Sequence, residues 1–345
     1  MKLLSVKPYF YIMIPMAAVV MIFASSTGAA NISAGDAFKI IASSIPYIRE
    51  LIDVSHISDS AISIILFVRL PRIILAFLVG YGLSVVGSSM QGMLKNPMAD
   101  PFIIGTSSGA ALGAALAIVL NLNQTFLGFG AVSGMAFLGA LLSTSIVYQL
   151  ARTGSRVPVT TLLLAGIATG QFFSAILSFV MVIASRDVSS IIYWTMGSFS
   201  ARGWNHVLLV IIPMVLGSGL LMIHARDLNL LLIGEETAQN TGVEVEKVKI
   251  VILIVSTLMT AFAVSVSGII GFVGLIIPHI TRMVVGPDHR VLIPACGIMG
   301  GIFLVMTDTF SRTVIAPTEL PVGVLTALAG APFFIYLLRK AKKME

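Results

Sequence analysis

The sequence predicts an all-α membrane protein, a polytopic bundle of about ten transmembrane helices that forms one domain over residues 1–345. Three observations predict this fold class. Hydrophobic residues make up 57% of the chain and charged residues 10%, with a mean hydropathy of +1.02, which leaves too few charges for a soluble domain. Apolar runs of about 20 residues, the length that crosses a bilayer as a helix, recur along the whole chain. Basic residues collect in short patches between these runs.

The expected spans are distributed along the whole chain and are joined by short connections, apart from residues 29–64. In chain order they are residues 9–28, 65–93, 103–121, 128–150, 159–184, 205–224, 248–269, 271–286, 290–314 and 322–338. No segment is left over that would form a soluble catalytic domain.

Basic residues are distributed unequally between the connections on the two sides of the membrane. If the amino terminus lies inside, the carboxyl terminus returns inside, and 14 of the 21 Lys and Arg residues are cytoplasmic against 7 outside. The inside set includes Lys2, Lys7 and Lys343, and the outside set includes Arg49. This bias obeys the positive-inside rule and places both termini in the cytoplasm. The net charge of +6 therefore reflects membrane topology and does not indicate nucleic-acid binding.

The first span allows a second interpretation. Lys2 and Lys7, an apolar run and the small residues 25–30 also fit a secretory signal with its cleavage site. The run from Tyr9 to Ala24 is long for the apolar region of a signal, which favours a retained anchor. Residues 31–63 are interrupted by charged and small polar residues, so we expect an external surface segment with one or two short helices there.

The second span differs in character along its length. It begins with Arg69, Pro71 and Arg72 and ends in a proline-bracketed polar turn over residues 96–101. Small residues four apart in its middle, and again at the start of the third span, allow close approach of helix backbones. A span with a basic outer end, a closely packed middle and a polar inner turn is typical of a transport pathway.

The outer arginines have two explanations at this point. Basic side chains at a membrane interface often snorkel toward the headgroups. Alternatively, guanidinium groups suit bidentate pairing with the carboxylates of another protein, and Arg69 and Arg72 run against the charge bias of the chain. Arg312 stands at the outer end of the ninth span, where Asp308 lies four residues earlier and is positioned to pair with it.

The longest inside loop, residues 226–247, carries the signature of a short surface helix. Glu235 and Glu236 would occupy its first turn, where the helix dipole favours acidic side chains, and Gly242 would end it in a left-handed conformation. Such a helix is a plausible attachment point for a soluble motor, although an ordinary interfacial helix has the same pattern.

Motifs for energy conversion within the chain are missing from the sequence. Lys never follows Gly, so the Gly-x-x-x-x-Gly-Lys-Ser/Thr phosphate loop is absent. The spans hold few ionisable groups, whereas an ion-coupled carrier usually keeps a carboxylate or histidine near the bilayer midplane. Energy is therefore expected from a partner protein, and an ion-coupled secondary carrier is the alternative from another class.

Eight short motifs occur in an order that closely resembles the permeases of iron-chelate and vitamin B12 ABC importers. They cover nearly the whole chain and are Arg-Leu-Pro-Arg (69–72), Asn-Pro-x-Ala-x-Pro (96–101), Gly-x-Ser-x-Gly-Ala (105–110), Leu-Leu-Leu-Ala-Gly (162–166), Gly-Glu-Glu-x-Ala (234–238), Gly-Phe-Val-Gly-Leu-Ile-Ile-Pro-His (271–279), Asp-His-Arg (288–290) and Glu-Leu-Pro-x-Gly (319–323). Each motif alone is weak evidence, but their order makes the resemblance specific.

This resemblance implies a ten-helix permease that pairs with a second copy of itself around a central pathway. Two cytoplasmic ATPase subunits would drive it, and an extracytoplasmic substrate-binding protein would deliver the cargo. ATP and magnesium would then bind in the ATPase partner, so this chain would have no cofactor, no resident metal and no enzymatic activity of its own. The expected location is the plasma membrane of a prokaryote, with membrane lipid around the bundle and no nucleic-acid partner.

The resemblance also implies roles for particular positions. The docking arginines of the family match Arg69, Arg72 and, less closely, Arg312. Its coupling segment, which contacts the ATPase, matches the loop that contains Gly234, Glu235, Glu236, Ala238 and Gly242. Its cytoplasmic gate matches Asn96, Met98, Val159, Thr160 and Thr161, with Met98 and Val159 departing from the usual residues.

The cargo is expected to be a metal chelate because sparse charge in the spans suits a bulky chelate better than a bare ion. A ferric siderophore ranks first, followed by haem and cobalamin (vitamin B12). An assembly scaffold or receptor, which would need no pathway, is a further alternative that vesicle uptake would exclude.

Overall fold

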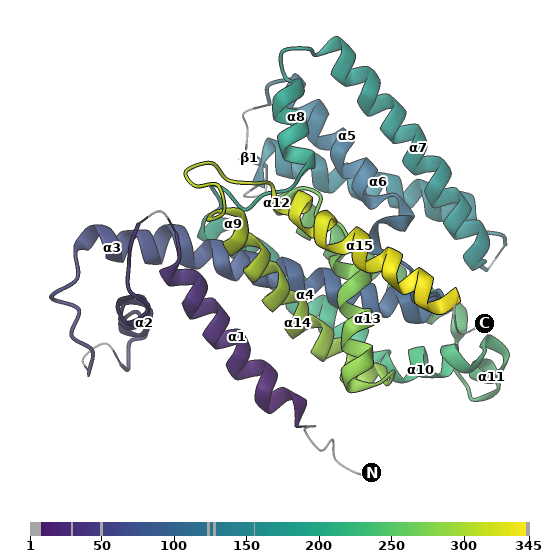
Figure 1. Ribbon diagram of the computed structural model, residues 1–345. Helices are drawn as coiled ribbons and strands as arrows, with labels where there is room; N and C mark the ends of the chain where they lie inside the picture. Colours follow the sequence, from purple (N-terminus) through teal and green to yellow (C-terminus); the bar gives the residue numbers. More distant parts are fainter. Residues whose placement is uncertain are drawn as a thin grey trace.

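The computed structural model describes residues 8–342 except 29, 49, 50, 123, 124, 127, 128 and 155. Lys2, Lys7, Arg49 and Lys343, which contribute to the expected charge bias, lie outside the described residues. In the described part, ten helices occupy the ten expected spans (Figure 1). They are α1 (Tyr9–Ser26), α4 (Leu70–Met93), α5 (Thr106–Val119), α6 (Ala131–Ala151), α7 (Val159–Ile183), α9 (Trp204–Ile223), α12 (Val245–Ser267), α13 (Val273–Val285), α14 (His289–Ser311) and α15 (Val322–Lys342).

Shorter elements connect these helices. Residues 31–63 contain α2 (Ala34–Ser43) and α3 (Asp59–Ser63), and a π-helical turn (Ile64–Arg69) joins α3 to α4. A 3₁₀ turn (Pro101–Ile104) precedes α5, and the two-residue strands β1 (Thr125–Phe126) and β2 (Phe129–Gly130) pair antiparallel before α6. The remaining short helices are α8 (Val188–Thr195), α10 (Ala225–Ile233) and α11 (Glu235–Asn240).

Two of the expected spans are shorter than the sequence suggests. Within the described residues, seven helices are long and apolar enough to cross a membrane, whereas α5 has 14 residues and α13 has 13. At 1.5 Å per residue such helices extend only about 20 Å. Left-handed backbone explains the late starts, because Gly105 has φ +80° just before α5 and Phe272 has φ +69° just before α13. α15, by contrast, covers its whole expected span, 322–338, and continues to Lys342.

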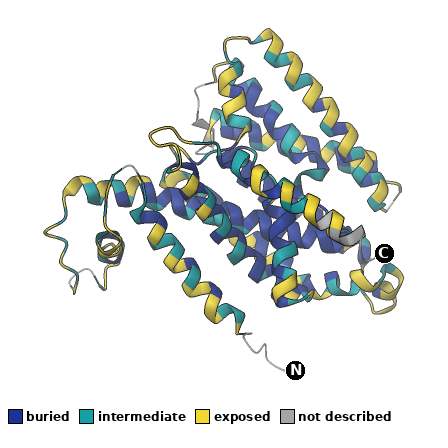
Figure 2. Ribbon diagram, in the orientation of Figure 1, coloured by how far each residue is buried: buried dark blue, intermediate teal, exposed yellow. Residues whose placement is uncertain are grey.

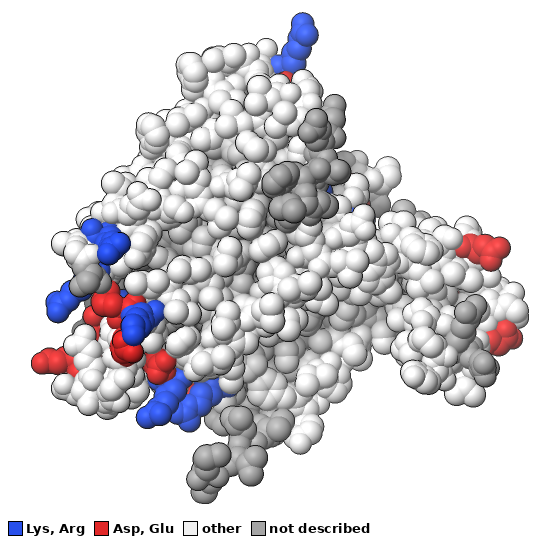
Figure 3. All heavy atoms as spheres, turned by 180° about the vertical axis from the view of Figure 1, so that it is seen from behind, with Lys and Arg blue, Asp and Glu red and all other residues white. Residues whose placement is uncertain are grey.

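The bundle has two distinct ends. We call the end where Arg69, Arg72 and Arg312 lie the arginine end, and the end that carries α10 and α11 the coupling end. α4 runs from the first to the second, α1 begins at the coupling end and α15 finishes there (Figure 1). Figure 3 shows that side chains of both charges gather at the coupling end, that a few more lie on the α2–α3 segment and at the top of the view near the α7–α8 connection, and that the surface between them is almost uncharged. This distribution is the one expected of a membrane-spanning bundle.

Glycines bring the central helices into backbone contact. α4 packs against α14, and a Cβ added to Gly80 would overlap the carbonyl oxygen of Gly300. α5 packs against α6 in the same way, since a Cβ on Gly109 would overlap the carbonyl oxygen of Gly139. The small residues that the sequence analysis singled out in the second and third spans therefore serve close helix packing.

Burial separates the central helices from the peripheral ones. α4 is enclosed along almost its whole length, as the dark blue ribbon in Figure 2 shows. α7 is the opposite case, because only 17% of its most apolar window is buried within this chain. Its exposed apolar residues include Leu164, Phe172 and Phe179. Such a surface must face lipid or another protein.

Candidate functional site

Arg69 is turned inward at the arginine end and is 5% exposed. Its guanidinium donates hydrogen bonds to the carbonyl oxygens of Ser25 at 2.8 Å, Ser26 at 3.0 Å and Ala30 at 2.6 Å. Two of these carbonyls belong to the last turn of α1, where helix carbonyls lack intrahelical partners and a cation is favoured. Arg69 therefore ties the end of α1 to the start of α4.

Arg72 forms the central ion pair of this end. Its Nε and Nη2 donate to the Asp308 carboxylate at 2.9–3.1 Å, and its Nη1 and Nη2 donate to Glu319 at 2.8 and 3.0 Å. The Asp308 side chain is 1% exposed, but that of Glu319 is 35% exposed at the rim. Burial opposes ionisation of Glu319, yet the hydrogen bonds and charge of Arg72 hold its pKa below the ordinary value.

Arg312 completes the cluster and is also buried, at 8% exposed. Its Nη2 donates to the carbonyl oxygen of Ala24 at 2.6 Å and to Thr309 Oγ1 at 3.3 Å. The expected pairing with Asp308 is the weaker one, because Arg312 Nε lies 3.8 Å away while Arg72 Nη2 lies 2.9 Å away. The structure thus brings all three predicted arginines together and gives each of them internal partners. Their docking role stays a prediction.

The first predicted gate segment is a polar turn at the coupling end of α4. Asn96 Oδ1 accepts a hydrogen bond from the backbone N–H of Met98 at 2.9 Å, which closes the turn. Gln91 supports the turn from within, since its Nε2 lies 3.4 Å from the carbonyl oxygen of Ala99 and its Oε1 accepts from Arg282 at 2.9 Å. Asn96 and Met98 are both half-buried.

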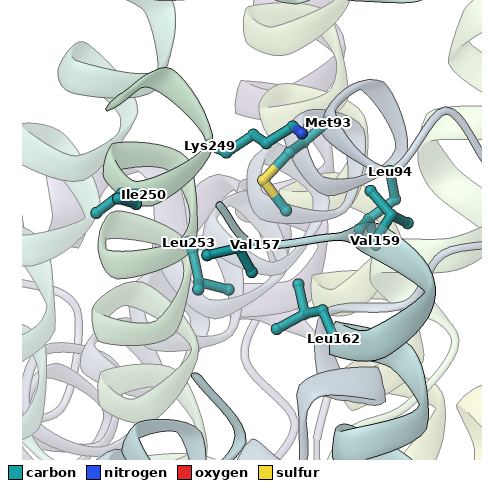
Figure 4. Close-up of a pocket in the computed structure, with 8 residues that line it drawn as sticks. All are labelled: Met93, Leu94, Val157, Val159, Leu162, Lys249, Ile250 and Leu253. Atoms are coloured by element: carbon teal, nitrogen blue, oxygen red, sulfur yellow. The ribbon is translucent and has the colours of Figure 1, made fainter. Parts of the chain in front are cut away.

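The second predicted gate segment begins α7. Val159 is half-buried, Thr160 is exposed and Thr161 is half-buried. Val159 and Leu94, two residues before Asn96, line the same small cavity of about 10 Å³ (Figure 4). Its other lining residues are Met93, Val157, Leu162, Lys249, Ile250 and Leu253. The two gate segments, distant in sequence, therefore meet at this cavity, which is too small to hold any cargo. We call the eight residues that line it the gate plug.

The predicted coupling loop folds into the helix pair α10–α11. Glu235 and Glu236 occupy the first turn of α11, Ala238 is buried beneath it, and Gly242 follows its end with φ +87°. Gly234 separates α11 from α10. These positions agree with the helix that the sequence indicates for this loop.

The two glutamates of α11 face different surroundings. Glu236 is exposed, whereas Glu235 Oε1 lies 2.9 Å from Lys249 Nζ and 3.8 Å from Lys95 Nζ. Lys249 also pairs with Glu246 at 3.1 Å, and Glu246 Oε2 accepts the backbone N–H of Val157 at 2.9 Å. We call Lys95, Glu235, Glu246 and Lys249 the coupling-end ion cluster. It links α11 to both predicted gate segments.

A second connection ties α10 to the start of α14. Asn229 Nδ2 donates to Asp288 Oδ1 at 2.7 Å, and Asn229 Oδ1 accepts the backbone N–H of His289 at 2.9 Å. The ring Nδ1 of His289 lies 2.8 Å from the same oxygen. The Asp-His-Arg motif at 288–290 thus holds the coupling helix pair against α14.

A model of the FecCD transport family matches residues 16–340, almost the whole chain. The chain belongs to the FecCD transport family. The 85 matching curated proteins include named permeases. The cobalamin import system permease BtuC of Halobacterium salinarum is 46% identical over 82% of this chain and 75% of its own length. The hemin transport system permease HmuU of Yersinia pestis is 40% identical over 84% of this chain and 86% of its own length.

The fold of this FecCD protein also has a solved counterpart. A solved structure described as an inward-facing conformation of an ABC transporter assigned to the metal-chelate type is 30% identical, with a TM-score of 0.82, and the match covers 96% of this chain and 99% of the other. The family resemblance drawn from the eight motifs is therefore confirmed, as is the all-α polytopic fold.

Sequence reasoning missed part of this FecCD site. Lys249 and Glu246 are not among the predicted site residues, although the residue pattern of α12 indicates that Lys249 is buried. The buried residues Val245, Val248 and Ile252 recur with helical spacing, and Lys249 falls on the same face. A lysine on the apolar face of a helix needs a buried partner. This pattern could have found the lysine, but it could not have named Glu235 as its partner.

Proposed function

We propose that this FecCD protein is the membrane subunit of an ABC importer that receives a metal chelate from a binding protein and passes it to the cytoplasm. The observation that carries the proposal is the full-length likeness to the metal-chelate transporter structure. The two-ended anatomy supports it, because α11 is linked to one predicted gate segment through Lys95 and to the other through Lys249 and Glu246. ATP hydrolysis would take place in separate subunits.

The coupling end is the proposed attachment site for two cytoplasmic ATPase subunits. Its surface helix α11 presents Glu236 to solvent, and the buried Ala238 keeps the helix seated on the bundle. An ATPase that grips α11 would move the gate turn at Asn96 and Met98 and the start of α7 at Val159, Thr160 and Thr161. In this proposal both chain termini lie in the cytoplasm of a prokaryotic cell.

A second copy of the chain is the proposed neighbour of α7. The exposed apolar face of that helix is long, and Thr160 and Thr161 at its coupling end would border the space between the copies. A pathway between two copies would place both gates on one axis. The remaining apolar surface would contact lipid.

The arginine end is the proposed docking site for the substrate-binding protein. Glu319 at the rim is a half-exposed partner of Arg72, so a carboxylate of the binding protein can replace it without leaving a buried charge unpaired. Arg69 and Arg312 would hold α1 and α14 in the geometry that the exchange needs.

The cargo class is a metal chelate. The sequence ranks a ferric siderophore first, but the relatives named for cobalamin and hemin favour those two cargoes at least as strongly. All three are bulky complexes that arrive with their own metal ligands. We therefore propose the class and leave the three compounds to direct comparison.

Reconstitution tests the proposal. The chain is placed in proteoliposomes with its ATPase subunits and binding protein, and uptake of a ferric siderophore, haemin and cyanocobalamin is measured with and without ATP. We expect ATP-dependent uptake of one of them that persists with a protonophore and stops without the binding protein. Accumulation along an ion gradient by the chain alone would instead identify a secondary carrier.

A further inference from the structure

Lys249 is the most enclosed cation of the coupling end among the described residues, with a side chain only 8% exposed. It lies on α12, one turn inside the bundle, while Lys247 two residues earlier has a side chain that is 74% exposed. Burying an ammonium group is costly unless carboxylates surround it. Glu235 at 2.9 Å and Glu246 at 3.1 Å supply that compensation.

These two carboxylates come from different parts of the molecule. Glu246 belongs to α12 itself and holds the backbone of Val157, two residues before the predicted gate position Val159. Glu235 belongs to the coupling helix α11 and also reaches Lys95, the residue before Asn96. Lys249 therefore joins α11 to Glu246 and, through Glu246, to the start of α7, while Glu235 itself reaches the α4 turn at Lys95.

The stem of Lys249 is part of the gate plug. Its carbon chain lines the small cavity together with Met93, Leu94, Val157 and Leu162, and Figure 4 shows its amino group reaching past Met93. The charged group is thus held at the coupling end while the apolar stem packs against both gate segments. Moving the ammonium group necessarily disturbs that packing.

We propose that Lys249 is the positioning residue that transmits movement of the coupling helix to the cytoplasmic gate; this inference rests on the proposed function. When an ATPase displaces α11, Glu235 either carries Lys249 with it or leaves the buried ammonium with a single carboxylate. The second outcome is disfavoured in a low-dielectric setting. The displacement therefore reaches Val157 through Lys249 and Glu246, in parallel with the direct contact of Glu235 with Lys95, and the gate follows.

The two glutamates of α11 have different roles in this proposal. Glu235 points to Lys249 and connects α11 to the gate, whereas Glu236 is exposed and is free to contact the ATPase. Loss of Glu236 would weaken attachment of the motor. Loss of Glu235 would leave the motor attached and the gate unresponsive.

A gate-accessibility experiment tests the role of Lys249. Thr160→Cys is introduced into the full chain, where the native Cys296 is the single cysteine and is buried. The complex with its ATPase subunits is reconstituted in nanodiscs, and the rate at which a hydrophilic maleimide modifies position 160 is measured by mass spectrometry. The rate is compared without nucleotide and with ATP plus vanadate.

We expect nucleotide trapping to change the labelling rate about tenfold when Lys249 is present, a shift of about 1.4 kcal/mol in gate accessibility. Lys249→Met should abolish this response while ATPase binding and hydrolysis persist, and Lys249→Arg should restore it. Lys247→Met is the matched control, because Lys247 pairs with Glu244 on its own helix end, and it should keep the full response.

Glu235→Gln provides a gentler test if Lys249→Met does not fold, and it should also abolish the response. A full response in either of these variants would overturn the proposal. Failure of the unmodified chain to bind ATPase subunits would instead contradict the proposed function, so the two failures are distinguishable.

Discussion

Arg72 illustrates what a residue can and cannot reveal before its neighbours are known. Its guanidinium pairs with Asp308, which is 236 positions away in sequence. The helical i, i+4 rule instead pointed Asp308 toward Arg312, which is near but at 3.8 Å. Local spacing paired Asp308 with Arg312, and the family resemblance grouped the three arginines. The pairing of Asp308 with Arg72 depends on how α4 and α14 pack.

Removing Arg72 should destabilise the protein strongly. Arg72→Met would leave the Asp308 carboxylate, 1% exposed, without its closest cation, and we expect a loss of about 3–5 kcal/mol in the free energy of unfolding. Unfolding in detergent monitored by tryptophan fluorescence would measure it. Adding Asp308→Asn to the same chain should recover part of the loss, and equal stability of the single and double variants would contradict a buried ion pair.

Asp100 gives the gate turn a dependence on pH. Its carboxylate accepts the N–H of Phe102 at 2.8 Å, but desolvation raises its pKa to about 6 from the ordinary 3.8. The folded state then binds a proton that the unfolded state has lost between pH ~4 and ~6, so this group lowers stability as pH rises through that window.

Asp100→Asn should remove that loss, because an amide oxygen still caps the turn and carries no charge. The variant and the wild type should be alike in stability below pH ~4, and the variant should become more stable by up to about 3 kcal/mol above pH ~6. Melting temperatures across this range would decide it; a constant difference at all pH values would rule out titration of Asp100.

At the scale of elements, hydrophobic length predicted where helices lie better than how long they are. All ten expected spans contain a helix in the described part of the chain. The short α5 and α13 were not foreseen, since the left-handed residues Gly105 and Phe272 that delay them lie inside apolar runs. An apolar run indicates only that a segment is surrounded by apolar groups. In a packed bundle that holds for turns as well as for helices, so the run does not show where a helix begins.

The contact between α4 and α14 should tolerate no added side chain. A Cβ on Gly300 would overlap Ser84 and the carbonyl oxygen of Gly80, so Gly300→Val should separate the helices and lower the yield of folded protein sharply. Gly219 on α9 is the matched control, because within the described residues a Cβ there would meet no atom within 4 Å. Size-exclusion profiles of the two variants should differ; similar profiles would refute the tight contact.

At the scale of the whole molecule, composition fixed the class and the motif order fixed the family, while the connections between the ends and the gate came from the structure. The coupling-end ion cluster joins residues from three segments, and none of its long-range pairs follows from spacing along the chain. Neither the sequence nor the fold distinguishes the cargoes, because relatives that share the family are named for cobalamin in one case and hemin in the other.

The backbone contact of Gly80 with Gly300 bears on how the protein is made. α4 is synthesised early and α14 late, with 195 residues between the end of one (Met93) and the start of the other (His289). Until α14 enters the membrane, the small-residue face of α4 can contact only lipid or other helices. The inner helix of the mature bundle is therefore fully enclosed only after α14 has entered the membrane, so formation of the core lags well behind the synthesis of α4.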